Sequence, residues 1–325
     1  MIVSIKQNLL NHLVFTSTEA NYMLADFHGS KLTSLLNSSK LPDVDKPTIR
    51  EAIERYKYLK TNLLSIRNNC TSIDEMVGLI NDYKNYIDLD VIFDSTSDFL
   101  YRQNGQLKLS NSILEEFIPY LITPNIIKGL SNIRNISIGS RSSFSGLFFD
   151  SIPLLFGTGG VLIKSKDQDF AISKSYDLII KDSIDAPLEH KRQLNIAFFA
   201  SEIKTNLDKT MFQEACQTAR ELKMAVLGSK YILICEYLDM TPISTKLTPI
   251  DEVIILRKSK RLSSNIRQHF SQYSGRVNYR SEFKDFLENN PLSIDGFNRL
   301  INHLNEIFPE MEKIDDTNVL QKGYF

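Results

Sequence analysis

The sequence has few cysteines and no long apolar run, and each shortage excludes a class of protein. Its three cysteines, Cys70, Cys216 and Cys235, are odd in number and far apart. This argues against a disulfide framework or a cysteine-rich zinc site and suits a reducing cytoplasm. No apolar stretch approaches the roughly 18 residues that span a bilayer. Residues 1–15 lack a small-residue cleavage site and predict an amphipathic helix instead of a signal peptide. We therefore expect a cytoplasmic protein without membrane contact.

The chain also lacks a marked net charge and the common cofactor motifs. It has 38 Lys and Arg against 39 Asp and Glu, a formal net charge of −1, so any DNA-binding surface has to be local. It contains no G-x-G-x-x-G, no P-loop, no G-x-S-x-G and no H-E-x-x-H. The five histidines are scattered away from the cysteines, which argues against zinc.

Three segments of the chain differ in pattern. Residues 1–110 place apolar side chains at helical spacing, as in Ile49, Ile53 and Tyr56, and predict a helical subdomain. Residues 111–258 contain short β-prone runs and predict an α/β or α+β core with a mixed sheet. The runs cover residues 160–165, 169–173, 176–183, 194–205, 231–238 and 252–258, and an amphipathic helix at 208–225 separates the fourth from the fifth. Residues 259–325 are helical again.

A charged pair at the end of one apolar strand is the main candidate for chemistry. Five acid-x-lysine pairs occur, and they begin at Asp82, Glu189, Glu202, Glu221 and Glu282. Only the pair at Glu202 closes an apolar strand, where a spacing of two puts both side chains on the same face. The other four lie in helical or polar contexts. Burying such charges is costly unless they have a partner or a task.

A second carboxylate is expected from the neighbouring run at 176–183. If that run pairs antiparallel with the Glu202 strand, Asp177 and Glu202 meet at one end of the sheet. Together with the Ile203 carbonyl they would offer hard oxygen ligands to Mg²⁺. Lys204 would orient a water for attack on a phosphodiester or, with its pKa lowered by desolvation, act as the base. The alternative is a surface ion pair at a strand end and an unrelated turn aspartate.

The order Asp177, Glu202-x-Lys204 and then an amphipathic helix resembles the PD-(D/E)XK nuclease superfamily, although Tyr176 stands where that motif usually has proline. The segment EIKTNLDKTMFQEA is similar to the corresponding part of the Bpu-type family of type II restriction endonucleases, which cut interrupted, non-palindromic sites. The resemblance implies a restriction-endonuclease-like mixed sheet flanked by helices. It also implies that Gln213, on the following helix, contacts the scissile phosphate or a water there.

Nucleases of this superfamily often recruit another carboxylate from a helix before the first core strand. Glu115 and Glu116 lie in such a position and are candidates. A solvated helix face explains both residues equally well.

Two stretches are locally basic. Residues 257–280 contain seven Lys and Arg, no acid and interleaved aromatics, which is typical of a DNA footprint. Residues 117–149 also lack acids. The candidate DNA contacts are Lys128, Arg134 and Arg141 in the second stretch, and Arg257, Lys258, Lys260, Arg261, Arg267, Arg276 and Arg280 in the first. The alternative for both stretches is a solvated surface.

Together these features favour a Mg²⁺-dependent type II restriction endonuclease that cuts double-stranded DNA at a specific sequence. Its core would be residues 111–258, between a helical N-terminal part and a basic, helical C-terminal part. One candidate site per chain predicts a dimer, either of identical chains or with a related subunit. Two alternatives remain: another nuclease of the same superfamily, for repair or transposon ends, and a DNA-binding or protein-interaction module without catalysis.

Overall fold

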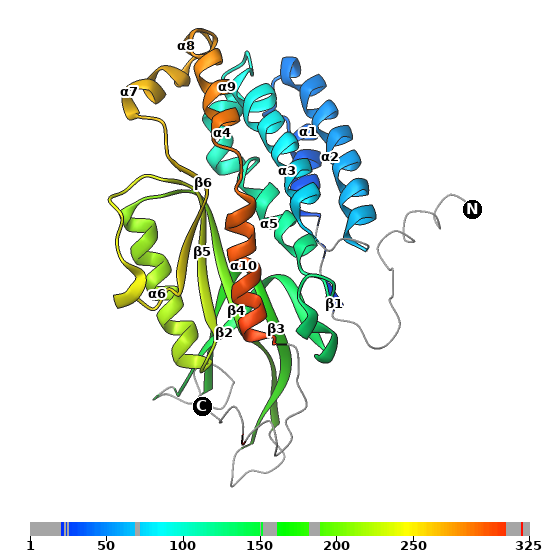
Figure 1. Cartoon of the computed structure of the whole chain (residues 1–325), viewed down its shortest axis with the longest axis vertical. Helices are drawn as coiled ribbons and strands as arrows, with labels where there is room; N and C mark the ends of the chain where they lie inside the picture. The colour runs from blue at the N-terminus through cyan, green and yellow to red at the C-terminus, as the bar shows by residue number, and fades with distance from the viewer. Residues whose placement is uncertain are drawn as a thin grey trace, which may run out of the picture.

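The computed structural model of the chain describes residues 21–22, 24, 26–68, 72–149, 151, 161–181, 189–309 and 320. The helix expected at residues 1–15 lies outside them. A mixed six-stranded sheet with the order β1-β2-β3-β4-β5-β6 forms the centre (Figure 1). Strand β3 runs antiparallel to both of its neighbours, β2 and β4. Strand β1 is parallel to β2. At the other side of the sheet, β4, β5 and β6 are parallel to one another. The expected mixed sheet flanked by helices is confirmed.

The described strands are β1 (Asn21–Tyr22), β2 (Ile136–Phe149), β3 (Val161–Lys181), β4 (Glu189–Leu207), β5 (Lys230–Leu238) and β6 (Glu252–Lys260). Helices before the sheet are α1 (Phe27–Leu36), α2 (Lys46–Arg67), α3 (Asp74–Tyr86), the π-helical η2 (Ile87–Phe93), α4 (Phe99–Leu107) and α5 (Asn111–Leu121). Later helices are α6 (Lys209–Ala225), α7 (Ser264–Arg267), α8 (Tyr273–Asn278), α9 (Arg280–Asn289) and α10 (Ile294–Ile307). Short 3-10 turns are η1 (Asp43–Asp45), η3 (Lys128–Asn132), η4 (Thr245–Leu247) and η5 (Gln268–Ser271). None of the described helices is long and apolar enough to cross a membrane.

Helices cover both faces of the sheet. Helices α5 and α10 pack against one face, where Phe117 and Phe297 meet edge to face at 5.5 Å. Helix α6 packs its Phe212, Ala215 and Ala219 on the other face. The hydrophobic cluster on the face covered by α5 and α10 also includes side chains from α1, α2 and α3. Residues from all three sequence segments therefore share one hydrophobic core.

Helix α6 begins and ends close to where the sequence pattern predicts. The Asp208 carboxylate accepts a hydrogen bond from the Met211 N–H at 2.8 Å, which caps the first turn. Gly228, three residues after the last helical residue, has a φ of +78°, a left-handed conformation that glycine adopts without a steric penalty. The helix that follows the acid-x-lysine strand is thus fixed by its own local sequence.

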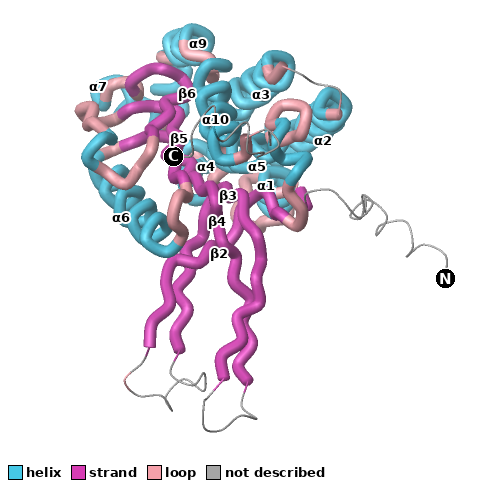
Figure 2. The backbone as a smooth tube through the Cα atoms, turned by 60° about the horizontal axis from the view of Figure 1, so that its bottom comes forward, coloured by secondary structure: helices cyan, strands magenta, loops and turns pink. Residues whose placement is uncertain are grey.

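Strand β3 is a single element of 21 residues, although the sequence predicts three short runs there. Polar residues between the apolar stretches look like turns, but the backbone continues because both β2 and β4 pair with it. The ends of β3 form two hairpins, one with β2 and one with β4. Figure 2 shows these hairpins extending from the helical body as two long ribbons. The centre of β3 lies at the sheet core, where Phe170 and Ile172 are fully buried.

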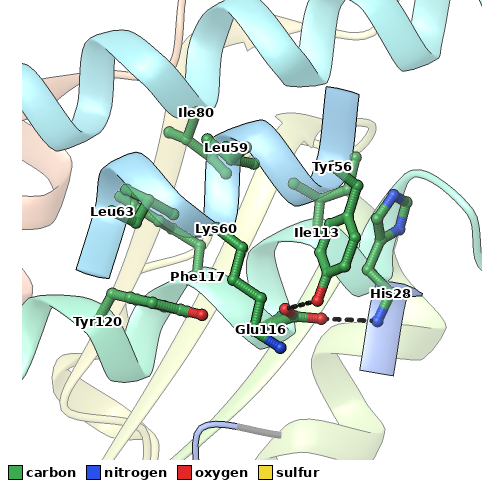
Figure 3. Close-up of a pocket in the computed structure, with 10 residues that line it drawn as sticks. All are labelled: His28, Tyr56, Leu59, Lys60, Leu63, Ile80, Ile113, Glu116, Phe117 and Tyr120. Atoms are coloured by element: carbon green, nitrogen blue, oxygen red, sulfur yellow. Dashed lines mark hydrogen bonds between the residues drawn. The ribbon is translucent and has the colours of Figure 1, made fainter. Parts of the chain in front are cut away.

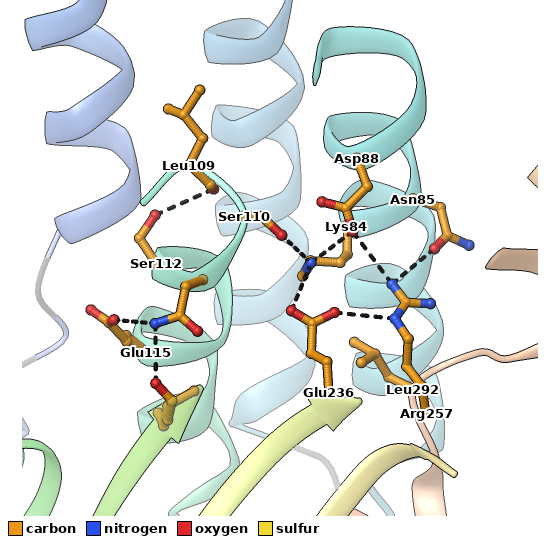
Figure 4. Close-up of polar contacts among 12 residues, drawn as sticks. Lys84, Asn85, Asp88, Leu109, Ser110, Ser112, Glu115, Glu236, Arg257 and Leu292 are labelled. Atoms are coloured by element: carbon orange, nitrogen blue, oxygen red, sulfur yellow. Dashed lines mark hydrogen bonds and ion pairs between the residues drawn. The ribbon is translucent and has the colours of Figure 1, made fainter. Parts of the chain in front are cut away.

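A largely buried cluster of charges joins the sheet to α3 and η2 (Figure 4). The Glu236 carboxylate on β5 lies 3.0 Å from the Lys84 ammonium and 3.1 Å from the Arg257 guanidinium, and all three side chains are 0% exposed. Asp88 lies 2.7 Å from Lys84 and 3.6 Å from Arg257. Two cations and two anions thus balance, which makes their burial tolerable.

We expect Arg257→Met to lower the free energy of unfolding by about 3 kcal/mol, because it leaves the buried Glu236 carboxylate without one of its two cations. Urea denaturation followed by circular dichroism measures this loss. Arg280→Met is the matched control, since Arg280 pairs with Asp90 and Asp94 at the surface and is 44% exposed. Its loss should stay below about 1 kcal/mol. Equal losses in both variants would contradict this account of the cluster.

Candidate active site

The acid-x-lysine pair lies on the α6 face of strand β4. The Lys204 ammonium is 2.6 Å from a Glu202 carboxylate oxygen, and the two side chains are 29% and 24% exposed. The phenol of Tyr231, on the adjacent strand β5, donates a hydrogen bond to the other Glu202 oxygen at 3.1 Å. Burial, and then the charge of Glu202, raise the pKa of Tyr231, so the phenol keeps its proton. The expectation that Glu202 and Lys204 share one face is confirmed.

A second carboxylate, Asp169 on β3, lies beside this pair. Phe170 pairs with Ser201 across the antiparallel strands, which makes Asp169 and Glu202 the next neighbours in the register. The Ile203 N–H donates to the Asp169 carboxylate at 2.8 Å. Burial raises the pKa of Asp169; the bond from Ile203 opposes this rise and the charge of Glu115 adds to it. Two strands therefore bring Asp169 and Glu202 together.

The expected meeting of Asp177 with Glu202 is wrong. Asp177 pairs with Gln193 in the β3–β4 register, and eight residues at about 3.3 Å each separate it from Asp169 along the strand. Its carboxylate is 50% exposed and lies 3.0 Å from the Lys191 ammonium. The sequence pattern put the start of a strand at Tyr176, whereas the strand begins at Val161 and carries Asp177 out along a ribbon.

Lys204 is held as a cation. Burial by itself would lower the pKa of Lys204, but the hydrogen bond and charge of Glu202 outweigh it. The charges of Asp169 and Glu214 act in the same direction as Glu202, and the net effect is a raised pKa. In this arrangement desolvation gives no net lowering of the pKa of Lys204.

Helix α5 brings Glu115 toward the same place. The Asn111 amide donates both to the Glu115 carboxylate at 2.6 Å and to the Ile203 carbonyl at 3.2 Å. Asn111 therefore ties the first turn of α5 to the strand between Glu202 and Lys204. Lys108 lies 3.8 Å from Glu115. The structure thus brings Glu115, a candidate extra acid, to the edge of the site.

Glu116, the other candidate acid, points elsewhere. It accepts hydrogen bonds from the Tyr56 phenol and from the His28 N–H, the latter at 2.8 Å (Figure 3). Burial raises the pKa of Glu116, and burial lowers the pKa of His28 to about 3. Glu116 therefore anchors α1 and α2 to α5.

Gln213 lies exposed on α6, one residue before Glu214.

Two carboxylates and one backbone carbonyl are the oxygen donors of the site. Among the described residues, no group of three or more His, Cys, Asp or Glu side chains could hold a metal ion by itself. Asp169 and Glu202 supply two carboxylates, and the carbonyl of Ile203 lies between Glu202 and Lys204. Two carboxylates with further oxygens from water or a phosphate are typical of Mg²⁺ sites.

In the fold, most cations of the segment at 257–280 lie close to carboxylates, so the segment carries less uncompensated positive charge than its sequence suggests. The expected DNA contacts of Arg257 and Arg276 are wrong, because both residues are 1% exposed and their side chains hydrogen-bond inside the protein. Lys258 lies 2.9 Å from Asp295. The other ion pairs are Arg261 and Arg267 with Asp239, and Arg280 with Asp90 and Asp94. The acids come from distant parts of the chain.

The four remaining candidate cations lie at or near the surface. Lys260 is exposed at the end of β6, Lys128 is exposed in η3, and Arg134 is exposed before β2. Arg141 lies half-buried in β2, with its guanidinium 3.5 Å from the Asn195 side-chain oxygen. Contact of these residues with DNA stays a prediction.

Comparison with known proteins gives a family and a fold. Residues 106–325 match the model of the Bpu10I restriction endonuclease family. A solved structure described as the native BbvCI A2B2 tetramer at low resolution superposes with a TM-score of 0.50 and 19% sequence identity, over 80% of this chain and 96% of that one. The likeness confirms the expected restriction-enzyme fold class. A search of curated proteins found no match.

Proposed function

Because the chain belongs to the Bpu10I restriction endonuclease family, and is therefore a DNA-cleaving enzyme, we propose that Asp169, Glu202 and Lys204 form its active site. The enzyme makes Mg²⁺-dependent double-strand cuts at a specific DNA sequence. The observation that carries this proposal is the 2.8 Å hydrogen bond from the Ile203 N–H to Asp169, which holds a second carboxylate beside the Glu202–Lys204 pair.

The donor set fits a divalent cation. The hard oxygen donors lie on two adjacent strands and are Asp169, Glu202 and the Ile203 carbonyl. Glu115 is near enough for its charge to raise the pKa of Asp169. When bound, Mg²⁺ would neutralise charge on the scissile phosphate and favour deprotonation of a water. Asp169 and Glu202 would hold it, and Tyr231 would keep Glu202 oriented through its hydrogen bond.

Lys204 acts as a hydrogen-bond donor in this proposal. Its ammonium carries three donors, of which Glu202 takes one at 2.6 Å. The remaining donors can orient the attacking water or bind a nonbridging oxygen of the phosphate, where negative charge grows in the transition state. Gln213, exposed on α6, would contact the same phosphate or a water there.

Cutting both strands requires more than one chain or more than one event, because each chain contributes one such site. We propose an assembly with a second copy or a related subunit. The structural neighbour is described as an A2B2 tetramer, which supports an oligomer that contains a related chain.

Incubation of the protein with plasmid tests the proposed function. Mg²⁺ should yield discrete fragments, EDTA should abolish them, and excess Mg²⁺ should restore them. Lys204→Met should slow cleavage about 100-fold or more, because one charge-assisted donor at the phosphate is lost. Lys284→Met is the control, since Lys284 belongs to another acid-x-lysine pair, on the surface of α9. Cutting that ignores sequence, or that persists in EDTA, would contradict the proposal.

A further inference from the structure

A groove with polar and apolar lining opens between helices α1 and α4, and all but two of its lining residues precede the region that matches the family model. It has a volume of about 830 Å³. Its polar lining residues are Ser30, Lys31, Ser34, Ser38 and Lys40 from α1 and the turn after it, and Gln103 and Gln106 from α4. No Asp or Glu is among the described residues that line it. The groove thus offers hydrogen-bond donors and positive charge.

The residue types match those that bind a phosphodiester backbone. Lysine, serine and glutamine side chains are among the usual donors to DNA phosphate oxygens. Ser30 and Ser34 are exposed and small, so a strand can approach the helix closely. An acidic protein partner would be attracted by the same charge. Lys31, however, lies within range of the charges of Glu115 and Asp169, and the scissile phosphate has to reach Asp169 in the proposed site.

Lys31 connects the groove to the active site. Burial lowers the pKa of Lys31, while the charges of Glu115 and Asp169 act in the opposite direction. Among the described residues, the Lys31 ammonium has no ion-pair or hydrogen-bond partner, and neither has that of Lys40. The two carboxylates offset part of the cost of burying Lys31, and a phosphate at hydrogen-bond distance would give its ammonium a direct partner.

The position of Lys31 is fixed by buried contacts one turn earlier on α1. The His28 N–H donates to Glu116 at 2.8 Å, and the His28 imidazole lies 2.9 Å from the Ser112 hydroxyl and 2.8 Å from the Tyr83 hydroxyl. These contacts dock α1 on α5, the helix that carries Glu115. A rigid support is what a phosphate-positioning residue needs.

We infer that the groove between α1 and α4 binds the DNA backbone next to the scissile phosphate, with Lys31 and Lys40 each contacting one phosphate. This inference rests on the proposed function, because it takes the strand from the groove to Asp169 and Glu202. It assigns to the N-terminal helices a role in positioning the substrate.

The salt dependence of DNA binding tests the inference without cleavage. The full-length protein is titrated in EDTA against a fluorescein-labelled duplex of about 30 base pairs and mixed sequence, from about 50 to 200 mM NaCl. Each lost phosphate contact reduces the slope of log K against log [NaCl] by about 0.9. Lys31→Ala/Lys40→Ala should therefore reduce the slope by about 1.8 and weaken binding about tenfold at about 100 mM NaCl.

Controls separate charge from folding. Lys57→Ala, on α2 and paired with Glu54 at the surface, should leave the slope unchanged. Lys31→Arg/Lys40→Arg should restore it. If the double alanine variant does not fold by circular dichroism, Lys31→Gln alone should reduce the slope by about 0.9. An unchanged slope in the folded variants, or no binding of the duplex by the wild type, overturns the inference.

The two proposals fail in different ways. If the wild type cuts plasmid but the lysine variants keep the full slope, the proposed active site is supported and the DNA-binding groove is contradicted. If the wild type never cuts plasmid but the slope is reduced in the lysine variants as expected, the groove is supported as a DNA-binding surface and the proposed catalysis is contradicted.

Discussion

Glu202→Gln is expected to reduce plasmid cleavage at least about 1,000-fold, which corresponds to about 4 kcal/mol of lost transition-state stabilisation. Glutamine keeps the size of the side chain and an oxygen for the Tyr231 phenol, 3.1 Å away. It removes the negative charge that would hold Mg²⁺ and that lies 2.6 Å from the Lys204 ammonium. The variant should therefore fold normally and lose activity. Single-turnover cleavage of a supercoiled plasmid measures the loss.

Glu282→Gln is the matched control for this variant. Glu282 begins another acid-x-lysine pair, but it is exposed on the first turn of α9. Its cleavage rate should equal that of the wild type. If Glu282→Gln is as inactive as Glu202→Gln, or if both are active, the strand context of Glu202 has no catalytic meaning.

The pair of Glu202 and Lys204, proposed to be catalytic, is readable from the sequence because its signal is local. A strand alternates its faces every residue, so two side chains two apart share a face wherever the strand lies. The apolar run before Glu202 and the amphipathic, Asp208-capped helix after it are also local properties. The family resemblance depends on the same window of the chain, and the match over residues 106–325 confirms it.

The second carboxylate depends on strand register, which is not local. Asp169 directly precedes the apolar run Phe-Ala-Ile, and its partner is set by the pairing of β3 with β4 over 12 positions. The sequence divides β3 into three runs because polar residues interrupt it. Pairing on both sides of the strand overrides that local preference. An acid immediately before a fully buried run was the available signal.

The basic segment at 257–280 carries less uncompensated charge than its sequence suggests, for a similar reason. Its acidic partners, such as Asp94, Asp239 and Asp295, are distant in sequence and become visible only in the fold. Lys31 illustrates the converse. A single lysine on a helix gives no signal, and its place beside Glu115 and Asp169 arises from the docking of α1 on α5.

Asp169→Asn is expected to reduce cleavage at least about 1,000-fold, whereas Asp177→Asn should leave it nearly unchanged. Asparagine at 169 can still accept the hydrogen bond from the Ile203 N–H, now 2.8 Å, so the strand pairing should persist. It removes one of the two carboxylate charges proposed to hold Mg²⁺. Asp177, 50% exposed and paired with Lys191, contributes only a solvent-screened ion pair.

The most direct test of the active site is the comparison of these two aspartate variants in one single-turnover assay, on the same plasmid and with the same Mg²⁺ concentration. Circular dichroism of both proteins verifies their folding. The account predicts an inactive Asp169→Asn and an active Asp177→Asn. An active Asp169→Asn together with an inactive Asp177→Asn would contradict it, and would place the second carboxylate on the ribbon instead of in the sheet core.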